Sequence, residues 1–119
     1  MTPFGERLRA LRQARGQTAK QLAAALGVTP AYLSALEHGP RGRPSRRFVE
    51  LVCQHFGIIW DEAEALQALA RGSHPRVVVD TAGLTPTHTA LANRLAERIA
   101  KLSEAEAEAL LAALGGREG

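Results

Sequence analysis

Residues 18–39 read TAKQLAAALGVTPAYLSALEHG and contain two short helix-forming stretches separated by a glycine. Thr18 opens the first stretch three residues before a glutamine, which is the spacing of a capping box. Gly27 is the residue type that commonly ends a helix. Thr29 can cap the second stretch, and Pro30 stands at a first helical position, where its missing N–H costs no hydrogen bond. The sequence therefore predicts two helices joined by a tight turn, which is a helix-turn-helix motif.

The second of these helices is expected to have one buried and one exposed face. With successive residues 100° apart and Leu33 pointing inward, Leu36 and Glu37 also point inward. The side chains that face outward or flank the outward face are mostly small or carry a hydroxyl: Ala31, Tyr32, Ser34, Ala35 and His38. So slim a surface can enter a groove of a duplex, where it and the Thr29–Pro30 end could meet base edges. A helical hairpin in an ordinary bundle is the alternative that these residues alone leave open.

Three further segments before residue 72 have the apolar spacing of amphipathic helices, namely residues 4–16, 46–57 and 60–72. In the first, Phe4, Leu8 and Leu11 form an apolar stripe opposite an arginine-rich face. In the third, Asp61 and Glu64 have the spacing of another capping box. We therefore expect a five-helix domain over residues 1–71.

The remainder, residues 72–119, is expected to form a helical extension. Glycine and proline interrupt its first part, where RVVVD at residues 76–80 is the only β-branched run and the candidate for one short strand. A threonine–proline pair at 85–86 opens a helix to about residue 102, and Ser103 with Glu106 caps a final helix. The predicted fold class is all-α: a five-helix domain followed by a C-terminal helical hairpin.

Charge is distributed unevenly between these parts. Residues 1–47 hold nine lysines and arginines against two acids, whereas residues 48–119 hold six against ten. A basic front end joined to an acidic back end is typical of a polyanion-binding module with an appended region, although solvated charged faces give the same pattern.

The N-terminal part resembles the Cro and phage-repressor helix-turn-helix family, the XRE-type bacterial regulators. The resemblance covers residues 4–70, and the matching pieces follow in the family's order: LRALRQARG, QLAAALGVTPAYLSALEHG, RPS and HFGI. It implies five packed helices, of which the third reads the major groove of DNA. It also implies an ion pair between Arg12 of the first helix and Glu37 of the third, which agrees with the need of a buried carboxylate for a partner.

The resemblance directs attention to two sets of DNA contacts. For the bases and the groove we expect Thr29, Pro30, Ala31, Tyr32, Ser34 and Ala35. For the phosphates we expect Gln17, Thr18, Arg41, Arg43, Arg46 and Arg47, since arginines beside a groove-reading helix neutralise phosphates and release counterions. The family's usual glutamine at the start of the second helix is replaced by Ala19, and its polar base readers by Pro30, Ala31 and Ala35. Methyl contacts and DNA shape must then supply more of the specificity.

The extension offers an apolar stripe for self-association. Leucine and isoleucine recur at helical spacing along one side of its first helix, and we expect the dimer interface at Leu84, Leu91, Leu95, Ile99 and Leu102. A hairpin this small has too little core to be stable alone, so it must cover something. Two copies packing together is the expected arrangement, with RVVVD pairing across the two-fold axis; folding back on the chain's own domain is the alternative.

Several other functions are not supported by the sequence. The single cysteine, Cys53, excludes a disulfide within the chain, and none of the four histidines stands at a metal-ligand spacing. Ser34 and His38 lack an orienting acid, so we expect no enzyme, no metal and no cofactor. No signal-like or membrane-spanning segment is seen, and we expect a cytoplasmic protein, bacterial or phage-encoded.

The sequence thus predicts a sequence-specific DNA-binding transcriptional regulator, a repressor, that binds double-stranded DNA as a homodimer on a pseudo-palindromic operator. The alternative is an antitoxin that binds a protein partner through residues 72–119 and represses its own operon. The sequence separates these two functions poorly, because antitoxins use the same DNA-binding fold.

Overall fold

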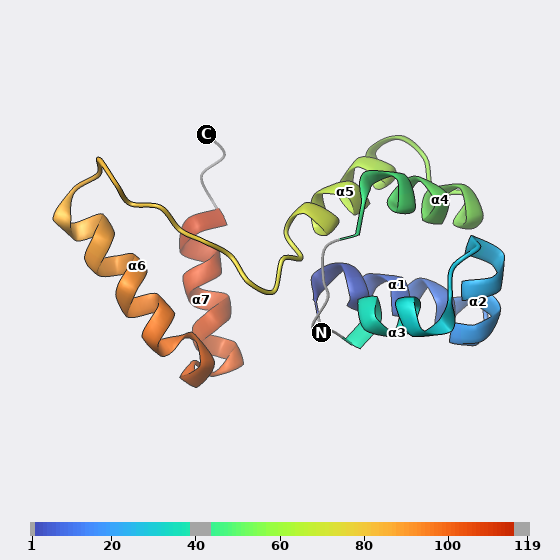
Figure 1. Ribbon diagram of the computed structural model, residues 1–119, viewed down its shortest axis with the longest axis horizontal. Coiled ribbons are helices and arrows are strands. Elements are labelled where there is room, and N and C mark those ends of the chain that lie inside the picture. Colours follow the sequence, from blue (N-terminus) through green and yellow to red (C-terminus); the bar gives the residue numbers. More distant parts are fainter. Residues whose placement is uncertain (1, 39–43, 116–119) are drawn as a thin grey trace. The chain divides into compact units, whose positions relative to one another are not determined.

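The structure, a computed structural model, describes residues 2–38 and 44–115 (Figure 1). All regular structure within these residues is helical, as predicted. The α-helices are α1 (Pro3–Ala14), α2 (Ala19–Leu26), α3 (Pro30–His38), α4 (Arg46–Phe56), α5 (Trp60–Arg71), α6 (Pro86–Arg98) and α7 (Glu104–Gly115), and a 3-10 turn η1 (Ile99–Lys101) follows α6. None of these helices is both long enough and apolar enough to cross a membrane.

Contacts between residues divide the chain into two units, residues 1–77 and 78–119. In the first unit, α1 packs against α3 and α5, α2 packs against α3 and α4, and α4 packs against α5. The buried apolar side chains come from all five helices: Phe4, Leu8, Leu22, Ala23, Leu26, Leu33, Leu36, Phe48, Val49, Val52, Cys53, Leu66 and Ala70. This unit therefore has one continuous core, made mostly of aliphatic side chains.

Helix starts follow the predicted capping chemistry with one exception. The hydroxyl oxygen of Thr18 accepts from the backbone N–H of Gln21 (3.1 Å), whose side chain accepts from the backbone N–H of Thr18 (2.8 Å). The predicted box of Asp61 and Glu64 is wrong, because α5 begins earlier, after Ile59, with no side-chain cap. Its first residue, Trp60, has a positive φ of 55° and is largely exposed, so a strained backbone turn starts this helix instead.

The first unit extends past the last turn of α5. Ser73 is 2% exposed, and its hydroxyl accepts from the backbone N–H of Phe4 (3.0 Å) while it donates to the carbonyl of Leu69 (2.6 Å). One side chain thus satisfies a free donor at the start of α1 and a free acceptor at the end of α5. No pattern in the sequence indicated this role for Ser73, because a serine after a helix is also common in exposed linkers.

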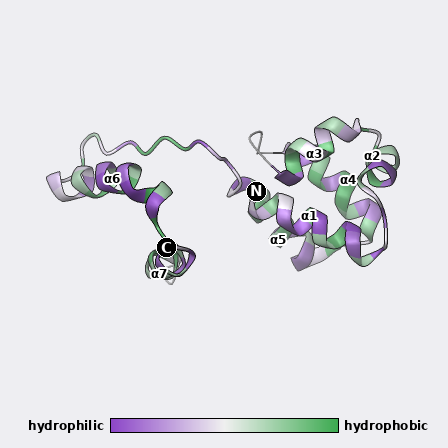
Figure 2. Cartoon of the chain, turned by 90° about the horizontal axis from the view of Figure 1, so that it is seen from below, coloured by the Kyte–Doolittle hydropathy of each residue, from purple (hydrophilic) through white to green (hydrophobic). Residues whose placement is uncertain are grey.

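The second unit has no buried residue among those the structure describes. Both of its helices begin with side-chain caps: Thr85 with His88 for α6, and Ser103 with Glu106 for α7. Figure 2 shows hydrophobic and hydrophilic residues interspersed along α6. The candidate strand at 76–80 is wrong for the single chain, since the described residues include no strand; an extended segment cannot form a ladder without a partner strand.

Candidate nucleic-acid interface

Helix α3 is oriented by three inward side chains. Leu33, Leu36 and Glu37 are all at most 2% exposed. The opposite surface is open to solvent at Thr29, Pro30, Ala31, Tyr32 and Ser34, while Ala35 is half-buried. The hydroxyl oxygen of Thr29 accepts from the backbone N–H of Tyr32 (3.1 Å) and so caps the helix. The helix therefore presents a narrow surface of small side chains, with only a few polar groups at its start.

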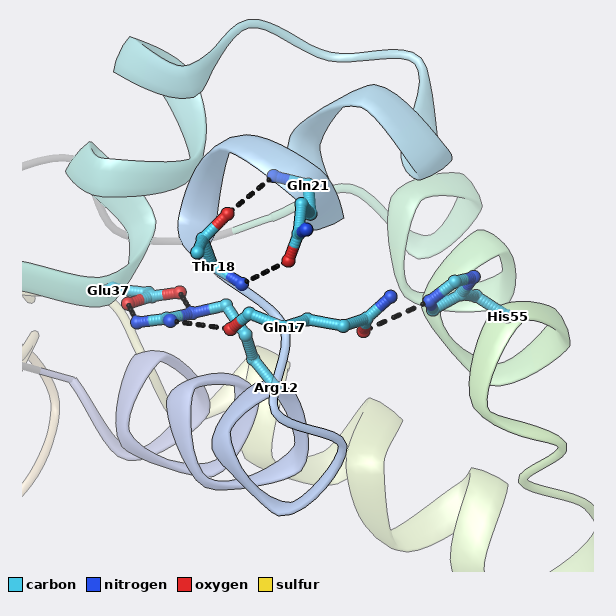
Figure 3. A network of polar contacts seen from close by, with 6 residues as sticks. All are labelled: Arg12, Gln17, Thr18, Gln21, Glu37 and His55. Atoms are coloured by element: carbon cyan, nitrogen blue, oxygen red, sulfur yellow. Dashed lines mark hydrogen bonds and ion pairs between the residues drawn. The ribbon is translucent and has the colours of Figure 1, made fainter.

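Arg12 fixes α3 and the turn before α2 at the same time (Figure 3). Its Nε and one terminal nitrogen donate to the two carboxylate oxygens of Glu37 at 2.9 and 3.0 Å. Its other terminal nitrogen donates to the carbonyl of Gln17 at 3.0 Å. The hydrogen bonds to Glu37 raise the pKa of the Arg12 guanidinium. Both helices of the motif are thus held by one rigid, planar cation.

Gln17 and Thr18, which we expected at the phosphates, also have structural roles. The side-chain oxygen of Gln17 lies 3.3 Å from Nε2 of His55 on α4, and the residue is half-buried. Thr18 is exposed, and its hydroxyl oxygen accepts in the capping box of α2. Each keeps a donor for another acceptor, the amide NH₂ of Gln17 and the hydroxyl proton of Thr18.

Tyr32 is held in place by an aromatic contact that the sequence did not indicate. Its ring packs edge-on against Phe48 of α4 with ring centroids 5.5 Å apart, and Phe48 in turn packs edge-on against Phe4 of α1. Tyr32 remains 39% exposed, and partial burial raises the pKa of its hydroxyl. The side chain is therefore a neutral hydrogen-bond donor in a fixed position beside the exposed face of α3.

The expected arginines lie partly outside the described residues. Arg41 and Arg43 belong to residues 39–43, which the structure does not describe. Arg46 and Arg47 are exposed in the first turn of α4, whose N-cap is Ser45. Arg47 lies 4.0 Å from Glu50, and Arg46 makes no ion pair within the described part of the chain. The start of α4 thus combines a helix N-terminus with two solvated cations, which favours anions.

A profile described as a helix-turn-helix domain matches residues 3–67, which is more than half of the 119 residues. The chain belongs to the helix-turn-helix family. The profile spans α1 to most of α5, and therefore includes Arg12, Glu37 and the whole exposed face of α3.

Two relatives from Bacillus subtilis (strain 168) are similar to parts of the chain. It is 50% identical to the uncharacterized HTH-type transcriptional regulator RghRB over 44 residues, 37% of this chain and 32% of the relative. It is 39% identical to the HTH-type transcriptional repressor RghR over 61 residues, 51% of this chain and 45% of the relative. The chain spans less than half the length of each of these relatives. No solved structure matches it.

Sequence reasoning missed a close approach that sets the position of α3. A Cβ on Gly5 of α1 would lie 2.2 Å from the carbonyl oxygen of Leu36 and 3.0 Å from that of Glu37. Only glycine leaves room for this crossing of α1 and α3. A glycine near the start of a predicted helix was the available signal, but by itself it does not reveal which neighbour comes close.

The expected dimer residues lie on the second unit. Leu84, Leu91, Leu95 and Ile99 are exposed and Leu102 is half-buried, while Leu110, Leu111 and Leu114 of α7 are exposed as well. No cluster of three or more histidine, cysteine or acidic side chains suited to a metal ion occurs in the described residues. Because they are apolar and mostly exposed, the leucine and isoleucine side chains of this unit are its main candidates for contact with a protein partner.

Proposed function

We propose that this chain is a sequence-specific DNA-binding transcriptional regulator that acts as a repressor. The observation that carries the proposal is the orientation of α3, whose leucines and Glu37 are buried while its slim face is open to solvent. A helix with such a face, supported by a second helix across a tight turn, fits the major groove. One relative is itself described as a transcriptional repressor.

Few side chains on α3 can read bases by hydrogen bonds. Ala31, Ala35 and Pro30 supply methyl or methylene groups, which favour contact with thymine methyl groups. Tyr32 and Ser34 flank this face and can donate to the sugar–phosphate backbone. Specificity then depends on methyl contacts and on the sequence-dependent shape of the duplex.

The affinity would come largely from phosphate contacts. We propose that Gln17 and Thr18 contact one stretch of backbone and that Arg41, Arg43, Arg46 and Arg47 contact another. Each phosphate that an arginine neutralises releases a counterion, so binding weakens as salt is added. This term is independent of sequence, and it positions α3 over the base edges.

We further propose that the regulator is a homodimer held by the second unit, through Leu84, Leu91, Leu95, Ile99 and Leu102. The exposed apolar residues of α6 and α7 have no cover within the described chain, and a two-helix segment without a core is not stable alone. A dimer would place two copies of α3 in successive major grooves, about 34 Å apart, on a pseudo-palindromic operator.

Selection of bound duplexes from a random pool tests the proposal and would yield the operator. The salt dependence of binding to that operator then tests the phosphate contacts. We expect Arg46→Ala and Arg47→Ala to lower the log–log salt slope by about 0.9 for each contact removed. Arg71→Ala, which removes an exposed arginine of α5 that pairs with Glu64, is the matched control and should leave the slope unchanged. A pool that enriches no sequence would overturn the proposal.

A further inference from the structure

The segment Arg76-Val77-Val78-Val79-Asp80 has no partner strand among the residues that the structure describes. Arg76 lies in a bend, residues 77–80 have no regular secondary structure, and the three valines are 71%, 96% and 63% exposed. No backbone group of residues 76–80 hydrogen-bonds to another described residue. Three adjacent exposed valines beside unpaired N–H and C=O groups form a ready template for a second strand.

The charges of the segment are complementary to those of a second copy of itself. In an antiparallel pair centred on Val78, each residue faces the one equally far from the centre on the other copy. Arg76 then lies opposite Asp80 of the second copy, and Asp80 opposite its Arg76. One oxygen of the Asp80 carboxylate accepts from the backbone N–H of Ala82 (2.9 Å), which holds the carboxylate at the end of the segment.

We propose that residues 76–80 pair with the same residues of a second copy as a two-stranded antiparallel ribbon with Val78 on the two-fold axis. This inference rests on the homodimer proposed above and adds the element that sets its register. Because side chains alternate along a strand, Val77 and Val79 of both copies lie on one face as a cluster of four valines. The other face carries the two Val78 side chains, with one ion pair between Arg76 of one copy and Asp80 of the other on each side of them.

Neighbouring registers lose these contacts. A centre between Val77 and Val78 would place Pro75 opposite Asp80, and proline has no N–H for the ladder. A centre at Val79 would place Arg76 opposite Ala82 and leave both charges without an opposite partner. A two-stranded ribbon is marginal alone, so it fixes the alignment of a dimer whose main apolar contacts come from α6 and α7.

Charge exchange between the strands tests the register in the full-length protein. Arg76→Asp places two acids opposite each other at both ends of the ribbon, and Asp80→Arg places two cations there. We expect each single variant to dimerise about tenfold more weakly, and the double variant Arg76→Asp/Asp80→Arg to recover. A mixture of the two single variants should form heterodimers in excess of the statistical proportion, measured by native mass spectrometry. Asp80→Asn controls for the turn, since it keeps an acceptor for Ala82.

Cysteine cross-linking tests the two-fold position itself. Val78→Cys would face its own copy and should form an interchain disulfide readily under mild oxidation, whereas Val77→Cys faces Val79 and should not. Cys53 is 8% exposed and burial raises the pKa of its thiol, so it does not compete.

The results of these experiments distinguish a failure of the strand pairing from a failure of the proposed homodimer. A dimeric unsubstituted protein whose charge variants mix statistically, and whose cysteine variants cross-link equally, would overturn the strand pairing and leave the helical dimer standing. An unsubstituted protein that is monomeric at tens of micromolar would overturn both. Excess heterodimer together with cross-linking selective for position 78 would support the pairing.

Discussion

The ion pair of Arg12 and Glu37 joins helices α1 and α3 of the first unit. Three guanidinium donors reach both oxygens of Glu37 and the carbonyl of Gln17, so α1, α3 and the turn before α2 share one cation. Glu37 is 1% exposed, which makes the pair costly to break from either side. Since the hydrogen bonds raise an already high pKa, Arg12 stays charged throughout the neutral range.

We expect Glu37→Ala to lower the free energy of unfolding by about 3–5 kcal/mol, because it leaves the Arg12 charge partly buried and unpaired. Urea denaturation measures this directly. Glu50→Ala, which removes an exposed partner of Arg47, is the control and should cost less than about 1 kcal/mol. A Glu37 variant of normal stability that binds DNA poorly would contradict the structural role and suggest direct contact instead.

At the scale of elements, the packing of α1 across α3 depends on Gly5. A methyl group there would lie 2.2 Å from the carbonyl of Leu36, a backbone atom that moves only if the helix moves. The position of α3, and therefore its exposed face, is set in part by the absence of a side chain on another helix.

Gly5→Ala is expected to destabilise the first unit by about 1–3 kcal/mol, although alanine has the higher helix propensity. Thermal denaturation followed by circular dichroism measures the change. Gly72→Ala is the matched control, since its Cβ would make ordinary contacts at 3.6 Å and its φ is negative. Equal melting temperatures for the two variants would show that α1 and α3 can separate without cost.

Helix α7 begins with a capping box in which the titrating group is the carboxyl of Glu106. The backbone N–H of Ser103 donates to Glu106 (2.9 Å), and this bond, followed by that with the Ser103 side chain, lowers the pKa of the Glu106 carboxyl. The pKa of this carboxyl is therefore lower in the folded state than in the unfolded state. The stabilisation is fully present at pH values above the unfolded-state pKa, and it is lost as the pH falls through the folded-state pKa.

We therefore expect an NMR titration to place the pKa of Glu106 below the ordinary value of about 4.3, with α7 fraying as the carboxyl is protonated. Glu106→Gln keeps an acceptor without a titrating charge and should remove this part of the acid dependence. A Glu106 pKa at or above the ordinary value would show that the box does not persist in solution.

At the scale of the whole molecule, the boundary between the units decides which piece can be studied alone. Ser73 is part of the first core, because it bonds the start of α1 and the end of α5. The first unit ends at Val77, a few residues beyond Ser73.

Truncation after Val77 should give a folded monomer that binds the operator much more weakly than the full chain. Truncation after Gly72 should be less stable by about 1–3 kcal/mol, because the N–H of Phe4 loses its buried acceptor. Light scattering and urea denaturation of both fragments test this. A fragment ending at Val77 that still dimerises would place the dimer contact in the first unit, against the proposed interface.

The sequence by itself determined the helices, the caps of α2, α3, α6 and α7 and the inward direction of α3, because capping spacings and apolar periodicity are local properties of the chain. It also determined that Glu37 requires a partner, since its position on the helix buries it. Only the tertiary structure decided that Arg12 also holds Gln17, that Gly5 admits α3, that Phe48 supports Tyr32 and that Ser73 closes the first unit. These contacts join residues that are distant in the chain or in separate elements, and their geometry depends on how the helices cross.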